Sequence, residues 1–145
     1  MTIKYFAKNL LQFFPEYQRE YQLNLKQYGE ILGHVYFAEI NPVLSELLKI
    51  NQDKDLIRKY IDFIEDMYSD GDDDVKNVVE VTILEYLGDD ETVLRNAFTY
   101  FSEDLMQASK EIEASWGRRN IRIYHKRGKA LADWEWPDKY YLHSQ

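Results

Sequence analysis

Apolar side chains recur three or four residues apart through most of the first 116 residues, and this spacing constrains the fold more than any other feature. Only six glycines and three prolines occur among the 145 residues, so little interrupts the pattern. Such spacing aligns apolar side chains on one face of an α-helix. We therefore expect a mainly α-helical protein in which short turns connect the helices.

The clearest predicted helix covers residues 55–69. Its inward face would carry Leu56, Ile57, Tyr60, Ile61, Ile64 and Met67. Ser69-Asp70-Gly71 is expected to end this helix. The aspartates at 72–74 are expected to start the next one, because carboxylates cap and stabilise helix N-termini.

Further apolar stripes predict helices at residues 6–14, 17–32, 75–87, 91–101 and 103–116, and one that starts at Asn41-Pro42. Pro15 is expected to end the first of these helices, and Ser102 to cap the last. Residues 75–87 are rich in β-branched side chains, which also suit a strand. The aspartates before them and Gly88 after them favour a buried, central helix instead.

The sequence changes character after Gly117. Ile121 and Ile123 alternate with other residues, and a turn at residues 127–129 follows, a pattern that predicts a short C-terminal β-hairpin. We therefore divide the chain into a helical domain at residues 1–117 and an aromatic extension at residues 118–145. The aromatic side chains of the extension are expected to pack on the domain.

Charge is distributed unevenly between the two parts. Residues 1–115 carry 11 basic and 23 acidic side chains, a net charge of −12, whereas residues 116–145 carry 7 basic and 3 acidic, a net charge of +4. The acidic domain is expected to repel nucleic acid and anionic lipid. The basic, aromatic extension also suits a nucleic-acid contact, but we favour its docking on the chain's own domain.

An imperfect internal repeat supports an arrangement of paired helices. Phe63-Ile64-Glu65 precedes Gly71-Asp72-Asp73, and Ile83-Leu84-Glu85 precedes Gly88-Asp89-Asp90 in the same way. Successive helices with short acidic turns predict a multi-helix bundle of α-hairpins stacked in a HEAT-like manner.

Several short segments occur in an order that resembles a known family. They are Phe13-Phe14-Pro15-Glu16, Gly33-His34 followed by Tyr36-Phe37, Phe63-Ile64-Glu65, Gly71-Asp72 with Val75 and Asn77, and residues 81–87. The order resembles a poorly characterised family of small bacterial helical proteins with HEAT-like folds, some of them associated with immunity proteins of polymorphic toxin systems. The resemblance covers about residues 10–115. It implies a fold and a partner-binding role, and it implies no active site.

The residues that could carry chemistry do not form a recognisable motif. Cysteine is absent, which excludes disulfides and thiolate metal sites. An EF-hand that starts at Asp70 would place valines where glycine and the bidentate glutamate are needed. Glu65, Glu80 and Glu85 lack the Glu-x-x-His pairs of a di-iron site. We therefore expect no metal, no cofactor and no enzymatic activity.

The resulting hypothesis is a non-enzymatic protein-binding module, of an immunity or antitoxin kind, that occludes the basic surface of a toxin. Complementary charge would speed association with such a partner. The predicted partner-binding residues are Asp62, Glu65, Asp66, Asp72, Asp73, Asp74, Asp89 and Asp90.

Two alternatives remain open: a structural or scaffold homo-oligomer, and a metal-dependent carboxylate enzyme. No apolar stretch approaches the ~20 residues of a membrane-spanning helix. Lys4 and Lys8 interrupt the N-terminal apolar residues, which is untypical of a signal peptide. We therefore expect a cytoplasmic protein with no membrane partner.

Overall fold

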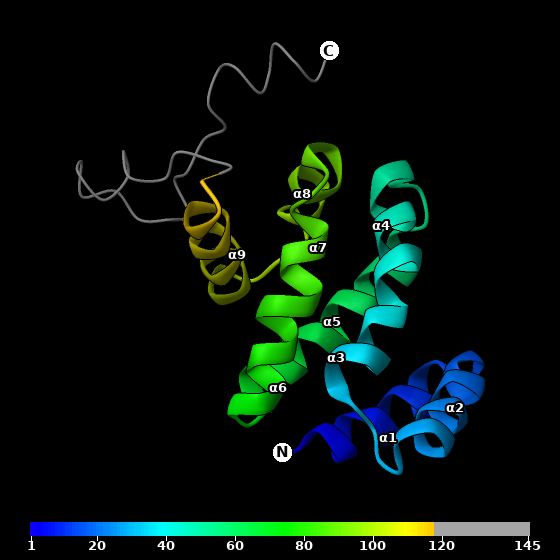
Figure 1. The fold of residues 1–145 in the computed structure, drawn as a ribbon. Helices are drawn as coiled ribbons and strands as arrows, with labels where there is room; N and C mark the ends of the chain where they lie inside the picture. Colours follow the sequence, from blue (N-terminus) through cyan, green and yellow to red (C-terminus); the bar gives the residue numbers. More distant parts are fainter. Residues whose placement is uncertain (118–145) are drawn as a thin grey trace.

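The computed structural model describes residues 1–117, which fold into a mainly helical structure (Figure 1). Helix α1 (Ile3–Phe13) begins where the Thr2 hydroxyl accepts a hydrogen bond from the Tyr5 N–H. The helix ends before Pro15, as predicted, and Pro15 starts the 3₁₀ turn η1 (Pro15–Tyr17). The predicted β-hairpin and the whole extension at 118–145 lie outside the described residues.

The second helix is shorter than predicted. Helix α2 (Gln18–Tyr28) ends at Gly29, which has a φ of 76°, and does not continue to Leu32. Glycine adopts this left-handed conformation without the steric cost of a Cβ atom, and it commonly ends helices. Leu32 therefore lies in the loop before α3 (Gly33–Tyr36), although it continues the apolar spacing of α2.

The helix predicted to start at Asn41-Pro42 is present but begins one residue earlier, and the prediction that Asn41 caps it was wrong. The 3₁₀ turn η2 (Phe37–Glu39) leads directly into α4 (Ile40–Ile50), so Asn41 already lies in the first turn. Its buried side chain donates a hydrogen bond from Nδ2 to the Thr82 carbonyl at 3.0 Å instead of capping the helix. Proline is tolerated near a helix start because the N–H groups there have no intrahelical acceptor.

Helix α5 (Lys54–Asp70) matches the predicted helix at 55–69 closely. The Asp53 carboxylate caps it by accepting a hydrogen bond from the Leu56 N–H at 3.2 Å. Leu56 itself is partly buried. The other predicted inward-facing residues are buried: Ile57, Tyr60, Ile61, Ile64 and Met67.

Residues 73–87 form one continuous central helix (Figure 1, green). It consists of α6 (Asp73–Asn77), the π-helical segment η3 (Val78–Leu84) and α7 (Glu85–Leu87). The Asp72 carboxylate caps it by accepting from the Val75 N–H at 3.0 Å, as predicted. The buried Val79 and Ile83 confirm a central, buried helix, whereas its π-helical geometry was not predicted.

Two more helices follow within the described residues. Helix α8 (Glu91–Ala97) ends earlier than predicted, and tight turns at residues 98–101 follow it, in which the Tyr100 carbonyl accepts a hydrogen bond from Arg58. Helix α9 (Glu103–Ser115) begins as predicted, with the Ser102 hydroxyl accepting from the Leu105 N–H at 3.2 Å.

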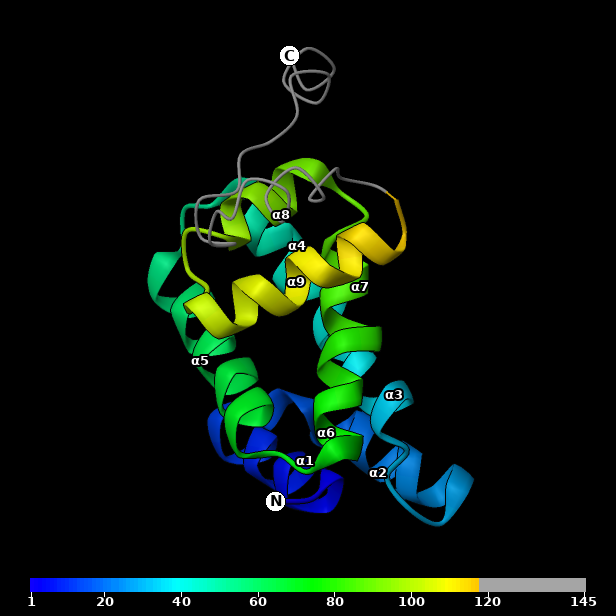
Figure 2. The same cartoon turned by 90° about the vertical axis from the view of Figure 1, so that its left-hand side faces the viewer.

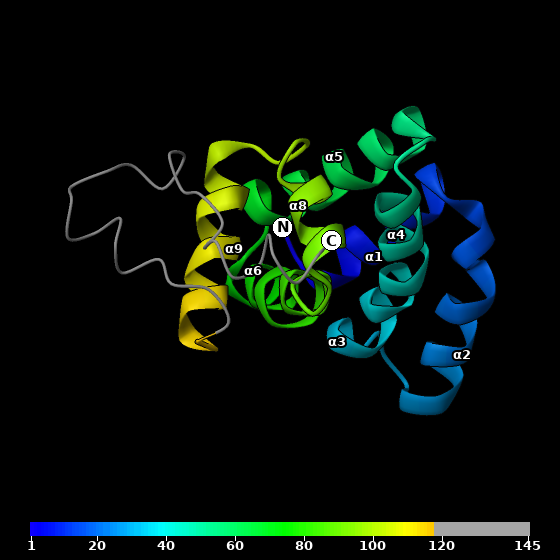
Figure 3. The ribbon, with the colours of Figure 1, turned by 90° about the horizontal axis from the view of Figure 1, so that it is seen from above.

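The central helix separates the other helices into groups. Helices α4 and α8 pack together, and α9 lies on the side of the central helix that faces away from α4 (Figure 3). Helix α1 lies at the end of the molecule where the central helix begins (Figure 2). The N-terminal helices and α6 therefore meet at the same end of the molecule.

Aromatic side chains join α1 and η1 to α5. The Phe14 and Tyr60 rings stack with their centroids 4.1 Å apart, and the hydroxyl oxygens of Tyr17 and Tyr60 are 2.8 Å apart. Burial, followed by this hydrogen bond, raises the pKa of Tyr17 above its usual value. Burying side chains of this size stabilises a fold by roughly 1.5–3 kcal/mol each.

These observations confirm the predicted mainly α-helical class. The HEAT-like stacking and the separate C-terminal unit stay predictions. None of the helices within residues 1–117 has the length and apolar character needed to span a bilayer.

Candidate functional site

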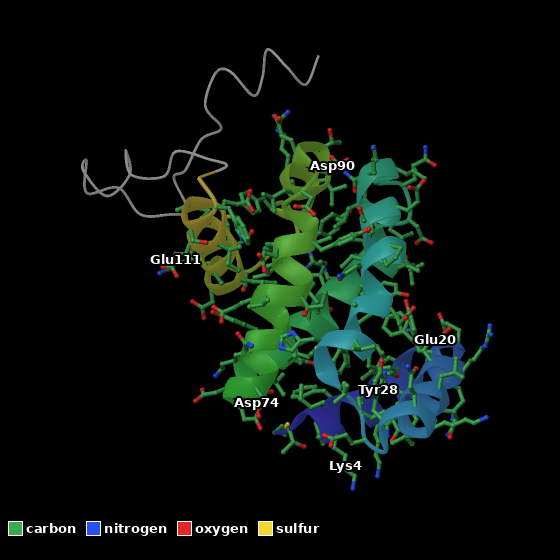
Figure 4. All side chains as sticks on the ribbon, in the orientation of Figure 1. Lys4, Glu20, Tyr28, Asp74, Asp90 and Glu111 are labelled. Atoms are coloured by element: carbon green, nitrogen blue, oxygen red, sulfur yellow. The ribbon has the colours of Figure 1, made fainter. Side chains whose placement is uncertain are left out.

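A cleft of about 620 Å³ opens where the N-terminal helices meet the start of the central helix. Its walls come from the first residues of α1, the loop between α2 and α3, and α6. Figure 4 shows Lys4 of α1 and Asp74 of α6 at this end of the molecule. The apolar part of the lining includes Ile3, Leu25, Ile31 and Val78.

Two close contacts hold the loop between α2 and α3 against the cleft. The buried Asn24 side chain accepts a hydrogen bond from the Leu32 N–H at 2.7 Å, so the loop is tied to α2. At Gly33, an added Cβ atom would lie 2.7 Å from Cδ1 of Ile3 and 3.0 Å from Cγ2 of Val78. Helix α3 therefore approaches α1 and η3 more closely than a larger residue would allow.

His34, at the edge of the cleft, connects α3 to the central helix. Its Nδ1 atom is 2.6 Å from the Thr82 hydroxyl oxygen, and its Nε2 atom is 3.3 Å from Nδ2 of Asn77. Asn77 and Thr82 are five residues apart, and backbone hydrogen bonds between residues five apart define a π-helix. The π-helical geometry thus helps to bring both side chains to one imidazole ring.

The lining of the cleft has more acidic than basic side chains. It includes the carboxylates of Glu30, Asp72 and Asp74, and the ammonium group of Lys4. Asp72 caps α6, whereas Glu30, Asp74 and Lys4 are exposed and form no ion pair with another residue of the described part. Carboxylates beside apolar surface suit a ligand that carries a cation on an apolar stem, such as a lysine or arginine side chain.

The family model described as "Domain of unknown function (DUF7674)" matches residues 7–117. The chain belongs to this family. No curated protein and no solved structure matches the chain. The DUF7674 domain contains most of the cleft and ends at Gly117, so residues 118–145 lie beyond it.

The DUF7674 domain contains all eight acidic residues predicted to bind a partner, but the structure does not bring them together. Asp72, Asp73 and Asp74 lie at the start of the central helix, and Asp72 and Asp74 line the cleft. Asp89 and Asp90 follow the other end of that helix, roughly 20 Å away at a rise of about 1.5 Å per residue. Figure 4 shows Asp74 and Asp90 at opposite ends.

Several of the predicted residues make contacts within the fold. The carboxylate of Glu65 accepts hydrogen bonds from the N–H and the hydroxyl of Ser102, both at 2.7 Å, and so ties α5 to the start of α9. Asp62 lies 3.7 Å from a guanidinium nitrogen of Arg58. These two carboxylates therefore also make contacts within the fold.

Asp90 also has a structural role. It caps α8 and forms a 3.2 Å ion pair with Lys49 of α4. Partial burial works against its ionisation, but the Val93 N–H and Lys49 together hold the pKa of Asp90 below its usual value.

Asp66 is exposed on the outer side of α5. Partial burial and then the neighbouring carboxylates of Asp70, Asp62 and Glu65 raise the pKa of Asp66 above its usual value. The acidic residues at the end of α5 therefore repel one another.

The sequence pattern did not identify the contact of His34 with Asn77 and Thr82. Their separations of 43 and 48 residues match no ligand or catalytic motif. Gly33 is the sequence signal that could have indicated the close approach there, because an added Cβ atom would meet Ile3 and Val78. Within residues 1–117, no three His, Cys, Asp or Glu side chains lie close enough to hold a metal ion.

Proposed function

We propose that the protein is a non-enzymatic protein-binding module whose cleft accepts a basic segment of a partner protein. The observation that carries this proposal is a cleft of about 620 Å³ in which apolar side chains lie beside the exposed carboxylates of Glu30 and Asp74. Asp70 and Asp73, both exposed, flank the cleft residue Asp72 closely in the sequence, and exposed Asp66 lies one helical turn before Asp70 on α5. This extent favours a protein partner over a small molecule.

Recognition would combine two physical contributions. The aliphatic stem of a partner lysine or arginine would pack on Ile3 and Leu25, with about 25 cal/mol of stabilisation for each Å² of apolar surface removed from water. Its charge would lie near Glu30 or Asp74, and each exposed ion pair of this kind contributes about 0.2–1 kcal/mol. The net negative charge of the domain would mainly accelerate association.

An immunity role is the form of this function that the sequence resemblance implies. The partner would then be a toxin, and binding would occlude the toxin's basic surface. The cleft supports binding of a basic segment in general, and the identity of the partner is a further part of the proposal.

The test uses a synthetic peptide of alternating arginine and leucine residues, titrated into the ¹⁵N-labelled full chain. Amide signals of residues 2–4, 29–34 and 72–78 are expected to shift. The double variant Glu30→Gln/Asp74→Asn is expected to bind about 2- to 30-fold more weakly, the range for the loss of two exposed ion pairs.

The matched control is Glu39→Gln/Glu46→Gln, which removes the same charge at two exposed positions outside the cleft. It should bind the peptide as the unaltered chain does. Equal weakening by both double variants, or shifts confined to other helices, would contradict the proposal.

A further inference from the structure

A second concave surface lies between α9 and the C-terminal half of the central helix. Two adjoining hollows, each of about 420 Å³, share Val81, Glu85 and Trp116 in their linings. Helix α9 contacts both η3 and α7, and Figure 2 shows it passing beside the central helix. We call this surface the α9 groove and define it by Val81, Glu85, Tyr86, Asp89, Ile112 and Trp116.

The α9 groove combines exposed apolar surface with negative charge. Val81, Tyr86 and Trp116 are 50%, 42% and 60% exposed, and all three line the same hollow. Glu85 and Asp89 lie in the same hollow. Exposed aromatic residues that are grouped together mark contact surfaces, and the carboxylates select a basic occupant.

We propose that residues 118–145 of the same chain occupy the α9 groove. The described part of the chain ends at Gly117, one residue beyond Trp116, and the left-handed φ of 68° at Gly117 turns the backbone out of α9. The segment that follows has a net charge of +4, opposite to that of the groove. Its aromatic residues, among them Trp134, Trp136, Tyr140 and Tyr141, suit the exposed rings there.

Covalent attachment favours this occupant over a separate molecule. A short tether holds its binding segment at an effective concentration in the millimolar range, so modest contacts suffice. The family model matches residues 7–117, so the segment lies outside the matched residues. In the groove it would cover Val81 and Tyr86 and keep other basic proteins from them.

The test uses the full chain and a spin label attached to a single introduced cysteine, since the natural sequence has none. With the label at Ala132→Cys, the amide signals of Val81 and Tyr86 are expected to lose intensity, while those of α2 keep it. The variant Glu85→Gln/Asp89→Asn should restore intensity at the groove. The control Glu39→Gln/Glu46→Gln, which removes as much charge elsewhere, should not.

A mixed sample distinguishes the occupants. When a spin-labelled chain without ¹⁵N is added to a ¹⁵N-labelled chain without the spin label, the proposal expects no loss of signal. Loss in the mixed sample would assign the groove to a second copy and overturn the proposal. Undiminished Val81 and Tyr86 signals in the labelled chain itself would also overturn it.

Discussion

The Nδ1 atom of His34 and the hydroxyl oxygen of Thr82 are 2.6 Å apart, although 48 residues separate them in the sequence. On the other side of the ring, Nε2 faces the side-chain amide nitrogen of Asn77 at 3.3 Å. Because an amide nitrogen can only donate, this arrangement predicts that Nε2 accepts and that Nδ1 carries the hydrogen. One tautomer of His34 thus links α3 to the π-helical segment.

Replacement of Thr82 by valine tests this link, because valine keeps the branched shape and removes the hydroxyl. The free energy of unfolding is expected to fall by about 0.5–1.5 kcal/mol in urea denaturation. Thr92→Val, at an exposed position of α8, serves as the control and should change little. Imidazole ¹⁵N shifts of the unaltered protein that show hydrogen on Nε2 would contradict the assignment.

The buried hydroxyl pair of Tyr17 and Tyr60 gives a second prediction. Tyr60→Phe leaves the Tyr17 hydroxyl without its partner, so the free energy of unfolding should fall by about 1–3 kcal/mol. The double variant Tyr17→Phe/Tyr60→Phe should be more stable than the sum of the two single effects predicts. Strictly additive losses in urea denaturation would show that the hydroxyl pair contributes no coupling energy.

Position 71 requires glycine because the backbone carbonyl of Met67 lies too close for a Cβ atom. An added Cβ atom would lie 2.3 Å from the Met67 carbonyl oxygen, although the φ of −74° suits any residue. We expect Gly71→Ala to lower the free energy of unfolding by about 1–3 kcal/mol. Gly29 is needed for a different reason: it has open space around it, and only its φ of 76° favours glycine. Asparagine, which adopts left-handed conformations, should be tolerated at position 29 and not at 71.

Asp66 is expected to destabilise the fold at neutral pH. Its pKa is raised in the folded protein, so the ionised carboxylate is less favourable there than in the unfolded chain. Asp66→Asn should therefore raise Tm at pH 7, with about 0.2–0.5 kcal/mol gained for each like-charged neighbour four residues away.

The gain from Asp66→Asn has a defined pH and salt dependence. It should shrink as the pH falls through the folded pKa and vanish below the unfolded pKa, where the carboxyl is protonated in both states. High salt should reduce it. Asp73→Asn, in the first turn of α6, should have the opposite sign, because it removes a carboxylate from a helix N-terminus. A lower Tm for Asp66→Asn at pH 7 would refute the repulsion.

The sequence predicted helix starts correctly where the capping side chain and the N–H that it binds are close in the sequence. Asp72 and Ser102 each accept a hydrogen bond from an N–H three residues later, and the sequence therefore revealed both helix starts. The predicted capping role of Asn41 failed because its side chain has a distant partner: it donates a hydrogen bond from Nδ2 to the Thr82 carbonyl, 41 residues away.

The candidate site was less predictable than the fold. The sequence singled out Asp72 and Asp74, which line the cleft, but it grouped them with Asp89 and Asp90 at the other end of the central helix. Charge can be counted from a sequence, whereas its position on a surface depends on how the helices pack.

Apolar periodicity and composition alone established a helical chain with an acidic domain and a basic C-terminal segment, because these properties depend on residues three or four apart or on simple counts. The packing of distant helices created the cleft, the contact of His34 with Asn77 and Thr82, and the α9 groove. Each of these needs side chains from separate helices. The pattern along any single helix does not encode such contacts.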